Sequence, residues 1–170
     1  KYLKPGKNMI AFQTFRWCDG TYLEDQDFLR LCGVGRDCYL YTRNPKYIQD
    51  IRVTPDLDAQ YKDATLNVSV NLKGSGVVDV KLLDKQGNSV ATTTLKRSCK
   101  VSADIAVSNP LKWTAETPNL YTLVATLKEG NKELEVIPVK VGFRKIELKN
   151  SQILVNGQPV LFKGADRHEM

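Results

Sequence analysis

The sequence predicts an all-β protein built around a two-layer sandwich of about seven strands. Residues 64–72 (Ala-Thr-Leu-Asn-Val-Ser-Val-Asn-Leu) alternate apolar and polar side chains without a break, as in a strand with one buried face. Further strands are predicted near 46–54, 77–84, 88–95, 101–107, 120–128 and 132–141. No segment shows a sustained helical period with capping residues, so we expect no major helix.

Short glycine-containing segments separate several of the predicted strands. Gly74-Ser75-Gly76, Gln86-Gly87-Asn88 and Glu129-Gly130-Asn131 each stand between two of them. Glycine and asparagine adopt the positive φ angles that tight turns require. We therefore expect a hairpin at each of these three positions.

Two segments flank the predicted sandwich. Residues 9–17 (Met-Ile-Ala-Phe-Gln-Thr-Phe-Arg-Trp) predict one more strand. Near the other end, Ile153-Leu154-Val155 and Pro159-Val160-Leu161-Phe162 lie on either side of Asn156-Gly157, the strongest short hairpin signal. The chain opens without Met and stops just after a charged cluster, so we expect both ends to be internal to a longer protein.

Composition and charge exclude several classes of protein. The chain has 170 residues and a formal net charge of +6, but its longest basic run is the pair Lys96-Arg97. Without aromatic side chains between the basic ones, this pattern predicts no nucleic-acid partner. No stretch of about 18 apolar residues is present, so we expect no membrane partner either.

Four cysteines are present, Cys18, Cys32, Cys38 and Cys99. None belongs to a CxxC pair and the single histidine is distant in sequence, which argues against zinc. Buried or half-buried free thiols are predicted, with a disulfide as the alternative if two Cα atoms approach within about 7 Å. This cysteine content fits a bacterial cytoplasm or periplasm equally well.

The first candidate site is an acidic loop. Residues 16–27 (Arg-Trp-Cys-Asp-Gly-Thr-Tyr-Leu-Glu-Asp-Gln-Asp) place four carboxylates within nine residues. The spacing is not that of an EF-hand, which needs ligands at alternate positions and a closing glutamate. The pattern leaves two interpretations open, a solvated loop and a site for a cation or a sugar.

Two further segments could carry chemistry. His168, the only histidine, stands in Asp166-Arg167-His168-Glu169. Neighbouring strand residues face opposite sides, so His168 and Glu169 cannot form a dyad directly, and both a structural and a catalytic role stay open. Residues 113–121 (Trp-Thr-Ala-Glu-Thr-Pro-Asn-Leu-Tyr) predict a sandwich corner. There Trp113 would fill the core and Tyr121 would begin the next strand, as the corner tyrosine of immunoglobulin-like sandwiches does.

These segments together resemble the large β-galactosidases of glycoside hydrolase family 2. The similarity runs from residues 16–27, with Cys32-Gly33 and Gly35-Arg36-Asp37, through residues 109–121. It continues through Val141-Gly142-Phe143-Arg144 to residues 155–169. The pieces stand in the order that the family shows and cover essentially the whole chain.

The resemblance implies a domain organisation. Residues 1–43 would be the C-terminal end of the sugar-binding jelly-roll domain, and residues 44–146 an immunoglobulin-like β-sandwich domain. Residues 147–170 would be the hairpin that starts the catalytic (β/α)₈ barrel. We therefore expect an all-β fold, an immunoglobulin-like sandwich of about seven strands flanked by a partial jelly roll and a barrel-entry hairpin.

The resemblance also implies a function. The longer protein would be a retaining hydrolase of terminal β-D-galactosides, in which one carboxylic acid protonates the leaving oxygen and a second carboxylate attacks. In the family both glutamates come from later barrel strands. This chain would therefore be a non-catalytic scaffold that holds neither residue.

Two substrate contacts are implied for the intact enzyme. Asp19 matches an aspartate that reaches the galactose 6-hydroxyl and a sodium ion, and His168 matches a histidine that lines the galactose pocket. Sodium and magnesium would be cofactors of the intact enzyme, with none in the fragment. Its partners would be the remaining domains and, only in the intact enzyme, the galactoside. The strand edges of residues 1–43 would also favour self-association.

Two other functions are compatible with the sequence. One is a stand-alone carbohydrate-binding module, although Trp17, Trp113 and Tyr121 stand in motifs that predict packing rather than an exposed sugar platform. The other is a fragment of a family 2 β-glucuronidase or β-mannosidase. The acidic run of residues 16–27 favours the large β-galactosidases over these.

Overall fold

The computed structural model describes residues 3–23, 32–96 and 99–166. The chain divides into two compact units. One comprises Thr42–Phe162 and the other comprises Lys1–Tyr41 with Lys163–Met170. Among the described residues, no helix is long and apolar enough to cross a membrane.

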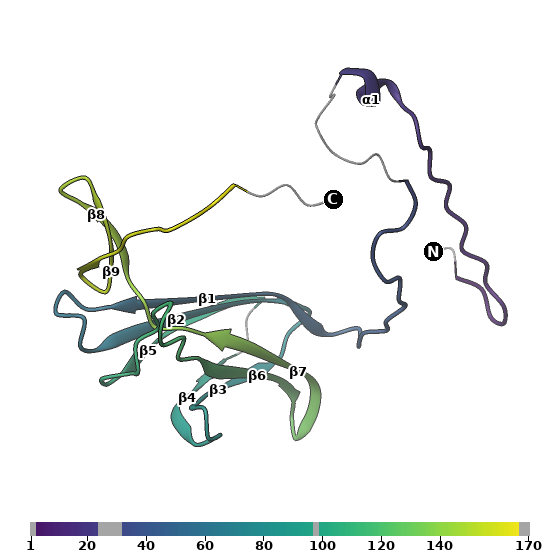
Figure 1. Cartoon of the computed structure of the whole chain (residues 1–170). Coiled ribbons are helices and arrows are strands. Elements are labelled where there is room, and N and C mark those ends of the chain that lie inside the picture. Colours follow the sequence, from purple (N-terminus) through teal and green to yellow (C-terminus); the bar gives the residue numbers. More distant parts are fainter. Residues whose placement is uncertain (1–2, 24–31, 97–98, 167–170) are drawn as a thin grey trace. The chain divides into compact units, whose positions relative to one another are not determined.

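The larger unit contains a sandwich of two antiparallel sheets (Figure 1). The first sheet has the order β1-β2-β5, with strands Tyr47–Leu57, Ala64–Lys73 and Lys100–Val107. The second has the order β4-β3-β6-β7, with strands Ser89–Leu95, Val77–Leu83, Tyr121–Glu129 and Lys132–Val141. The all-β fold and the seven predicted strands are confirmed.

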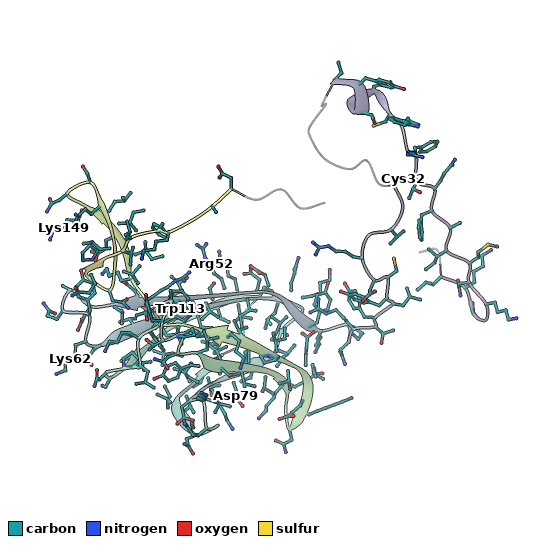
Figure 2. All side chains as sticks on the ribbon, in the orientation of Figure 1. Cys32, Arg52, Lys62, Asp79, Trp113 and Lys149 are labelled. Carbon is teal, nitrogen blue, oxygen red and sulfur yellow. The ribbon has the colours of Figure 1, made fainter. Side chains whose placement is uncertain are left out.

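The core lies between the two sheets and follows from the alternation in the sequence. On β2, Leu66, Val68 and Val70 are fully buried, while the residues between them lie outside the core. The same faces of β3 and β6 contribute Val78, Val80, Leu82, Leu123, Ala125 and Leu127. No polar or charged side chain of the described residues is buried. Arg52 of β1 and Asp79 of β3 are among the charged side chains outside the core (Figure 2).

The start of β1 is tied to β7 of the opposite sheet. The Arg43 guanidinium donates hydrogen bonds to the Glu135 carboxylate (2.8 Å from Nη2) and to the Ile48 carbonyl (3.0 Å). Glu135 in turn accepts a hydrogen bond of 2.6 Å from the Ile48 amide. Charge-assisted hydrogen bonds of this kind are stronger than neutral ones, so they hold the position at which the chain enters the sandwich.

Two of the three predicted hairpins are confirmed, and one prediction is wrong. Residues 84–88 and 129–132 join strands that pair with each other, β3 with β4 and β6 with β7. Residues 74–76 instead carry the chain from β2 in one sheet to β3 in the other. Glycine marks a tight change of direction in the hairpins and in the crossover alike. The sequence does not show whether the next strand returns beside the first or crosses to the facing sheet.

A third, smaller antiparallel sheet follows the sandwich in the order β10-β9-β8. Its strands are Ile146–Lys149, Gln152–Val155 and Gln158–Pro159 for β8, β9 and β10. The predicted Asn156-Gly157 turn joins β9 to β10, and both residues have positive φ, 52° and 76°. The second hairpin strand is shorter than predicted, and β8 is an additional strand paired with β9.

The predicted strand at Met9–Trp17 is wrong. The described residues before β1 form no strand, and their only regular element is the five-residue helix α1, Asp19–Leu23. Met9, Phe12 and Phe15 are 92, 66 and 71% exposed. A strand is stable only when hydrogen-bonded to a neighbour, and no strand of the described residues pairs with this segment.

The prediction of buried or half-buried cysteines is wrong, because all four are exposed, and none of them is joined in a disulfide. None lies within a strand of the sandwich. Cys18, Cys32 and Cys38 belong to the irregular N-terminal segment, and Cys99 directly precedes β5. Because these cysteines lie outside the strands, they do not belong to the alternating apolar residues that face the core.

Candidate functional site

Asp19, the first predicted site residue, stands at the first position of α1. The helix start is held locally, because the Cys18 amide donates a hydrogen bond of 3.1 Å to Thr21 Oγ1 and the Thr21 amide donates one of 3.0 Å to the Cys18 carbonyl. This is the arrangement of a capping residue and the side chain three positions later. It leaves the Asp19 carboxylate exposed.

Aromatic residues flank this carboxylate on both sides in sequence. The rings of Trp17 and Tyr22 stack with a centroid separation of 6.3 Å, and the Arg16 guanidinium lies 5.5 Å from the Trp17 centroid. An exposed carboxylate is a group that can bind a sugar hydroxyl or a hard cation. Among residues 3–23, 32–96 and 99–166, however, no three His, Cys, Asp or Glu side chains gather as a metal site.

The remaining predicted site residues fall outside the described part of the chain. His168 and the carboxylates of Glu24, Asp25 and Asp27 lie in residues 24–31 and 167–170. Of the two predicted galactose contacts, the structure therefore describes Asp19 alone. That Asp19 and His168 contact the same sugar stays a prediction.

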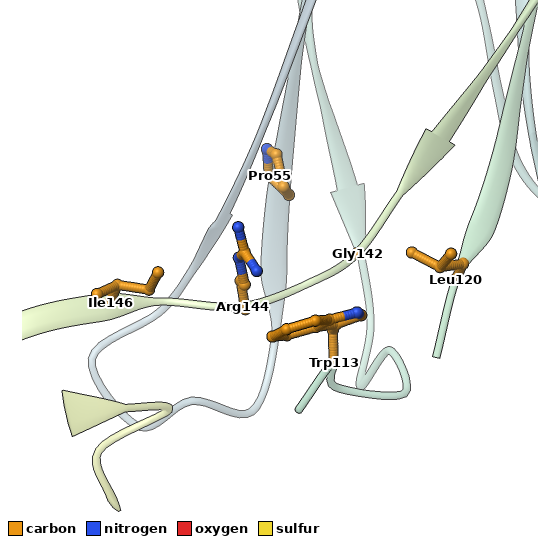
Figure 3. Close-up of a pocket in the computed structure, with 6 residues that line it drawn as sticks. All are labelled: Pro55, Trp113, Leu120, Gly142, Arg144 and Ile146. Atoms are coloured by element: carbon orange, nitrogen blue, oxygen red, sulfur yellow. The ribbon is translucent and has the colours of Figure 1, made fainter. Parts of the chain in front are cut away.

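The sandwich unit carries a pocket that the sequence did not predict (Figure 3). Its volume is about 410 Å³. It is lined by Pro55, Trp113, Leu120, Gly142, Arg144 and Ile146. The Arg144 guanidinium carbon lies 4.5 Å from the centroid of the Trp113 ring, a cation–π distance.

The position of Trp113 corrects a prediction. Trp113 is half-buried at the pocket rather than part of the core. Phe143 takes the core position instead and is fully buried, with its ring edge-on to Tyr121 at 5.2 Å. The Tyr121 hydroxyl accepts a hydrogen bond of 2.9 Å from the Leu111 amide, so the predicted corner tyrosine is confirmed.

The backbone beside Trp113 explains its placement. A Cβ at Gly142 would lie 3.1 Å from Trp113 Cδ1 and 3.2 Å from its Cβ, closer than side chains normally approach. The Trp113 amide also donates a hydrogen bond of 2.9 Å to the Phe143 carbonyl. The Val141-Gly142-Phe143-Arg144 segment thus has three local roles. Gly142 admits the indole, Phe143 fills the core and Arg144 covers the ring.

The third sheet is fastened to the sandwich next to this pocket. Asn156 donates from its side chain to the Trp113 carbonyl (3.1 Å) and accepts from the Lys145 amide (2.9 Å). Lys145 Nζ donates to the Leu57 carbonyl at 2.9 Å. Asn156 was identified in the sequence only as a turn residue, and its side-chain contacts could not be derived from the turn signal.

A second fastening runs through Tyr61, in the loop between β1 and β2. Its hydroxyl donates a hydrogen bond of 2.5 Å to Glu147 of β8, which raises the pKa of Tyr61 because ionisation would break that bond. A Cβ at Gly157 would lie 2.5 Å from Tyr61 Cε2, so only glycine fits beneath the ring. Sandwich and third sheet are therefore packed together as parts of one unit.

The loop that presents Tyr61 is organised by Asp58. The Asp58 carboxylate accepts hydrogen bonds from the amides of Lys62 (2.8 Å), Gln60 (3.1 Å) and Asp63 (3.1 Å). These bonds, that of Lys62 first, lower the pKa of Asp58 because they favour its charged form. Tyr61 itself has a φ of 54°, a left-handed conformation that the surrounding bonds hold in place.

Two protein-family models match this chain. The model described as "Glycosyl hydrolases family 2" matches residues 46–144, which is more than half of the chain. The chain belongs to glycosyl hydrolases family 2. A second model, "Glycosyl hydrolases family 2, sugar binding domain", matches residues 1–44.

Curated relatives of this family member are named beta-galactosidase. One from Pseudoalteromonas haloplanktis is 42% identical over 96% of the chain, and one from Priestia megaterium is 38% identical over 99%. The chain spans 17% and 18% of the length of these two relatives. The chain therefore corresponds to less than one fifth of each of these longer relatives.

Two solved β-glucuronidase structures share the fold over most of the chain. The β-glucuronidase of Ruminococcus gnavus has a TM-score of 0.60 and 29% identity, covering 70% of this chain and 19% of that one. The Bifidobacterium dentium β-glucuronidase complexed with coumarin-3-O-glucuronide has a TM-score of 0.64 and 28% identity, covering 70% and 21%. These likenesses agree with the sandwich architecture.

Proposed function

We propose that this chain is the non-catalytic scaffold of a β-galactosidase that hydrolyses terminal β-D-galactosides with retention. The observation that carries the proposal is the identity of 42% to a relative named beta-galactosidase across 96% of the chain. In retaining hydrolysis, two carboxyl groups about 5 Å apart act as acid/base and nucleophile. We place both in the catalytic barrel, outside these 170 residues.

Each of the three parts of the chain has its own role in this enzyme. Residues 1–43 form the end of a sugar-binding domain, residues 44–146 form the sandwich and residues 147–170 lead into the barrel. The hydrogen bonds of Tyr61 and Asn156 support the second junction, because they fix the third sheet against the sandwich. The sandwich would thus set the geometry between the sugar-binding domain and the barrel.

Asp19 and His168 would be the substrate contacts that this chain supplies. The exposed Asp19 carboxylate fits a sodium ion or a sugar hydroxyl, since both favour oxygen ligands. It provides one ligand, and the other sodium ligands and all magnesium ligands would come from the remaining domains. Those domains and the galactoside would be the partners, with self-association through residues 1–43 when they are missing.

Activity assays on two proteins test the scaffold role. We expect the full-length protein to hydrolyse nitrophenyl β-D-galactoside and the 170-residue chain to show no turnover. Titration of the chain with galactose and lactose should give no measurable heat. Clear turnover by the chain alone would contradict the scaffold role, and measurable sugar binding by the chain would favour a carbohydrate-binding module.

The solved β-glucuronidase relatives make β-glucuronidase activity the second candidate. The full-length protein should therefore be assayed on nitrophenyl β-D-glucuronide in parallel. We expect hydrolysis of the galactoside only. Preferential hydrolysis of the glucuronide would replace the proposed substrate class while leaving the scaffold role of the chain intact.

Asp19→Asn in the full-length protein tests the proposed sugar and sodium contact. Loss of a charged hydrogen-bond partner should raise KM for the galactoside by about tenfold and weaken the response to sodium. Asp50→Asn on β1, also exposed, is the matched control and should leave both unchanged. An unchanged KM and sodium response in Asp19→Asn would exclude the contact.

A further inference from the structure

The pocket at Trp113 combines apolar walls with a single charge. Pro55, Leu120 and Ile146 supply aliphatic surface, and Arg144 is the one charged side chain in the lining. Leu120 and Ile146 are 43 and 59% exposed, so the walls are open to a partner. Arg144 is exposed and forms no ion pair with any residue in the described part of the chain.

The guanidinium nevertheless lies against an aromatic ring. It lies 4.5 Å from the Trp113 ring centroid, and the ring is itself fixed by the close approach of Gly142. Stacking on an aromatic ring uses the flat face of an arginine and leaves its N–H groups at the edge available. Figure 3 shows the Arg144 side chain between Trp113 and Pro55 of β1. Such a pre-positioned fork matches a carboxylate, which it can bind through two parallel hydrogen bonds.

We propose that this pocket docks a carboxylate side chain, flanked by apolar residues, from the catalytic domain of the same polypeptide. The carboxylate would pair with Arg144, and its apolar neighbours would cover Leu120 and Ile146. This inference rests on the proposed function, because it takes the chain to be part of a longer β-galactosidase. It adds an interface that would orient the barrel against the sandwich.

Two observations favour a segment of the same polypeptide as the occupant. More than four fifths of the length of the curated relatives lies outside the region that this chain matches. In addition, Ile146 belongs to β8, the first strand after the sandwich, so the polypeptide that follows is tethered near the pocket. Tethering raises the local concentration of a segment and favours it over free partners.

The pocket composition argues against a free sugar as occupant. A sugar site requires several polar groups to satisfy its hydroxyls, whereas the side chains of this lining offer only the Arg144 guanidinium and the Trp113 indole N–H, and no acceptor. A second copy of the chain could still offer a carboxylate. The experiment must therefore distinguish an intramolecular contact from an intermolecular one.

Photo-crosslinking in the full-length protein makes that distinction. Replacement of Ile146 with p-benzoylphenylalanine places the probe at the pocket wall, and mass spectrometry identifies the linked peptide. Lys81 on β3, an exposed residue outside the lining, is the control position. We expect Ile146 to crosslink to a peptide of the same polypeptide beyond residue 170 that contains Asp or Glu, and Lys81 not to do so. Crosslinks confined to residues 42–162, links to a second copy, or no crosslink from Ile146 would overturn the proposal.

Substitution of Arg144 tests the charge. Arg144→Met keeps much of the side-chain length and removes the charge, so the crosslink yield should fall at least about tenfold. Arg144→Lys keeps the positive charge but lacks the two parallel donors of the guanidinium, so the crosslink yield should fall less than in Arg144→Met. An undiminished crosslink yield in a folded Arg144→Met variant would exclude the pairing of Arg144 with a carboxylate. The docking itself is tested by the Ile146 crosslink in the protein that retains Arg144.

Galactoside turnover, measured on the same full-length samples, separates this inference from the proposed function. A crosslink to an acidic peptide without turnover would retain the docking contact and reject the β-galactosidase assignment. Turnover without the crosslink would retain the assignment and reject the docking contact.

Discussion

The sandwich strands and the N-terminal segment have a similar share of apolar residues but different structures. In β2 and β6 every second side chain is buried, and each strand is paired on both sides. In residues 9–17 large apolar side chains are present at comparable density, yet Phe12 and Phe15 are more than 60% exposed and no strand forms. A segment rich in apolar residues can therefore form a strand, but the presence of neighbouring strands decides whether it does.

The largest expected difference between the two regions is the cost of removing one leucine side chain. Leu123→Ala on β6 removes a fully buried side chain and should lower the free energy of unfolding by about 2–5 kcal/mol. Leu23→Ala, at a position 84% exposed, should change it by less than about 0.5 kcal/mol. Urea unfolding of the 170-residue chain, followed by circular dichroism, measures both. Equal effects of the two substitutions would contradict the structural contrast.

A smaller difference is expected for two tyrosine hydroxyls. Tyr121→Phe removes the acceptor of the Leu111 amide and should destabilise the chain by about 1–3 kcal/mol, because a partly buried N–H group loses its partner. Tyr22→Phe is the matched change in the N-terminal segment, where the side chain is 75% exposed. Thermal unfolding should separate the two variants. Wild-type stability in Tyr121→Phe would show that the corner hydrogen bond is dispensable.

The smallest effect concerns the surface of the sandwich and depends on pH. Asp79 pairs with Lys128 Nζ at 2.9 Å and accepts a hydrogen bond of 2.8 Å from Thr94. The bond from Lys128 is the main reason that the pKa of Asp79 is lowered. Its stabilising contribution is therefore present above the ordinary pKa of an aspartate, about 4, and is lost as the pH falls through the lowered value.

Asp79→Asn tests this contribution. At pH 7 the variant should be less stable by at most about 1 kcal/mol, as is usual for exposed ion pairs. The difference from wild type should shrink in acid, where the wild-type carboxylate is protonated. Urea unfolding at several pH values measures both quantities. A difference that grows as the pH falls would have the wrong sign for this account.

Much of the fold could be predicted from the sequence because strand alternation and turn residues are local signals. They located the seven strands of the sandwich and the Asn156-Gly157 turn. They could not show that residues 74–76 cross between sheets, because that outcome depends on which strands pair. They also placed Trp113 in the core, where Phe143 lies, since both are large aromatic residues near the same corner.

The site was less accessible to sequence reasoning. Asp19 was identified through a resemblance, and its exposed position at the start of α1 is compatible with the predicted contact without testing it. The Trp113–Arg144 pocket was missed because its residues come from three separate segments of the chain, around Pro55, Trp113 and Arg144. The contact between Trp113 and Arg144 arises only once β7 has paired with β6. The one sequence signal for the pocket was Gly142, which directly precedes Phe143 and Arg144 and leaves room for the Trp113 side chain.

Hydrogen exchange, compared between the 170-residue chain and the full-length protein, tests the central contrast most directly. In both proteins we expect slow exchange in β2, β3 and β6, because these strands are paired on both sides within the chain. Amides of residues 9–17 should exchange rapidly in the chain and become protected in the full-length protein, where the sugar-binding domain would supply neighbouring strands. Equal protection of residues 9–17 in the two proteins would contradict the account.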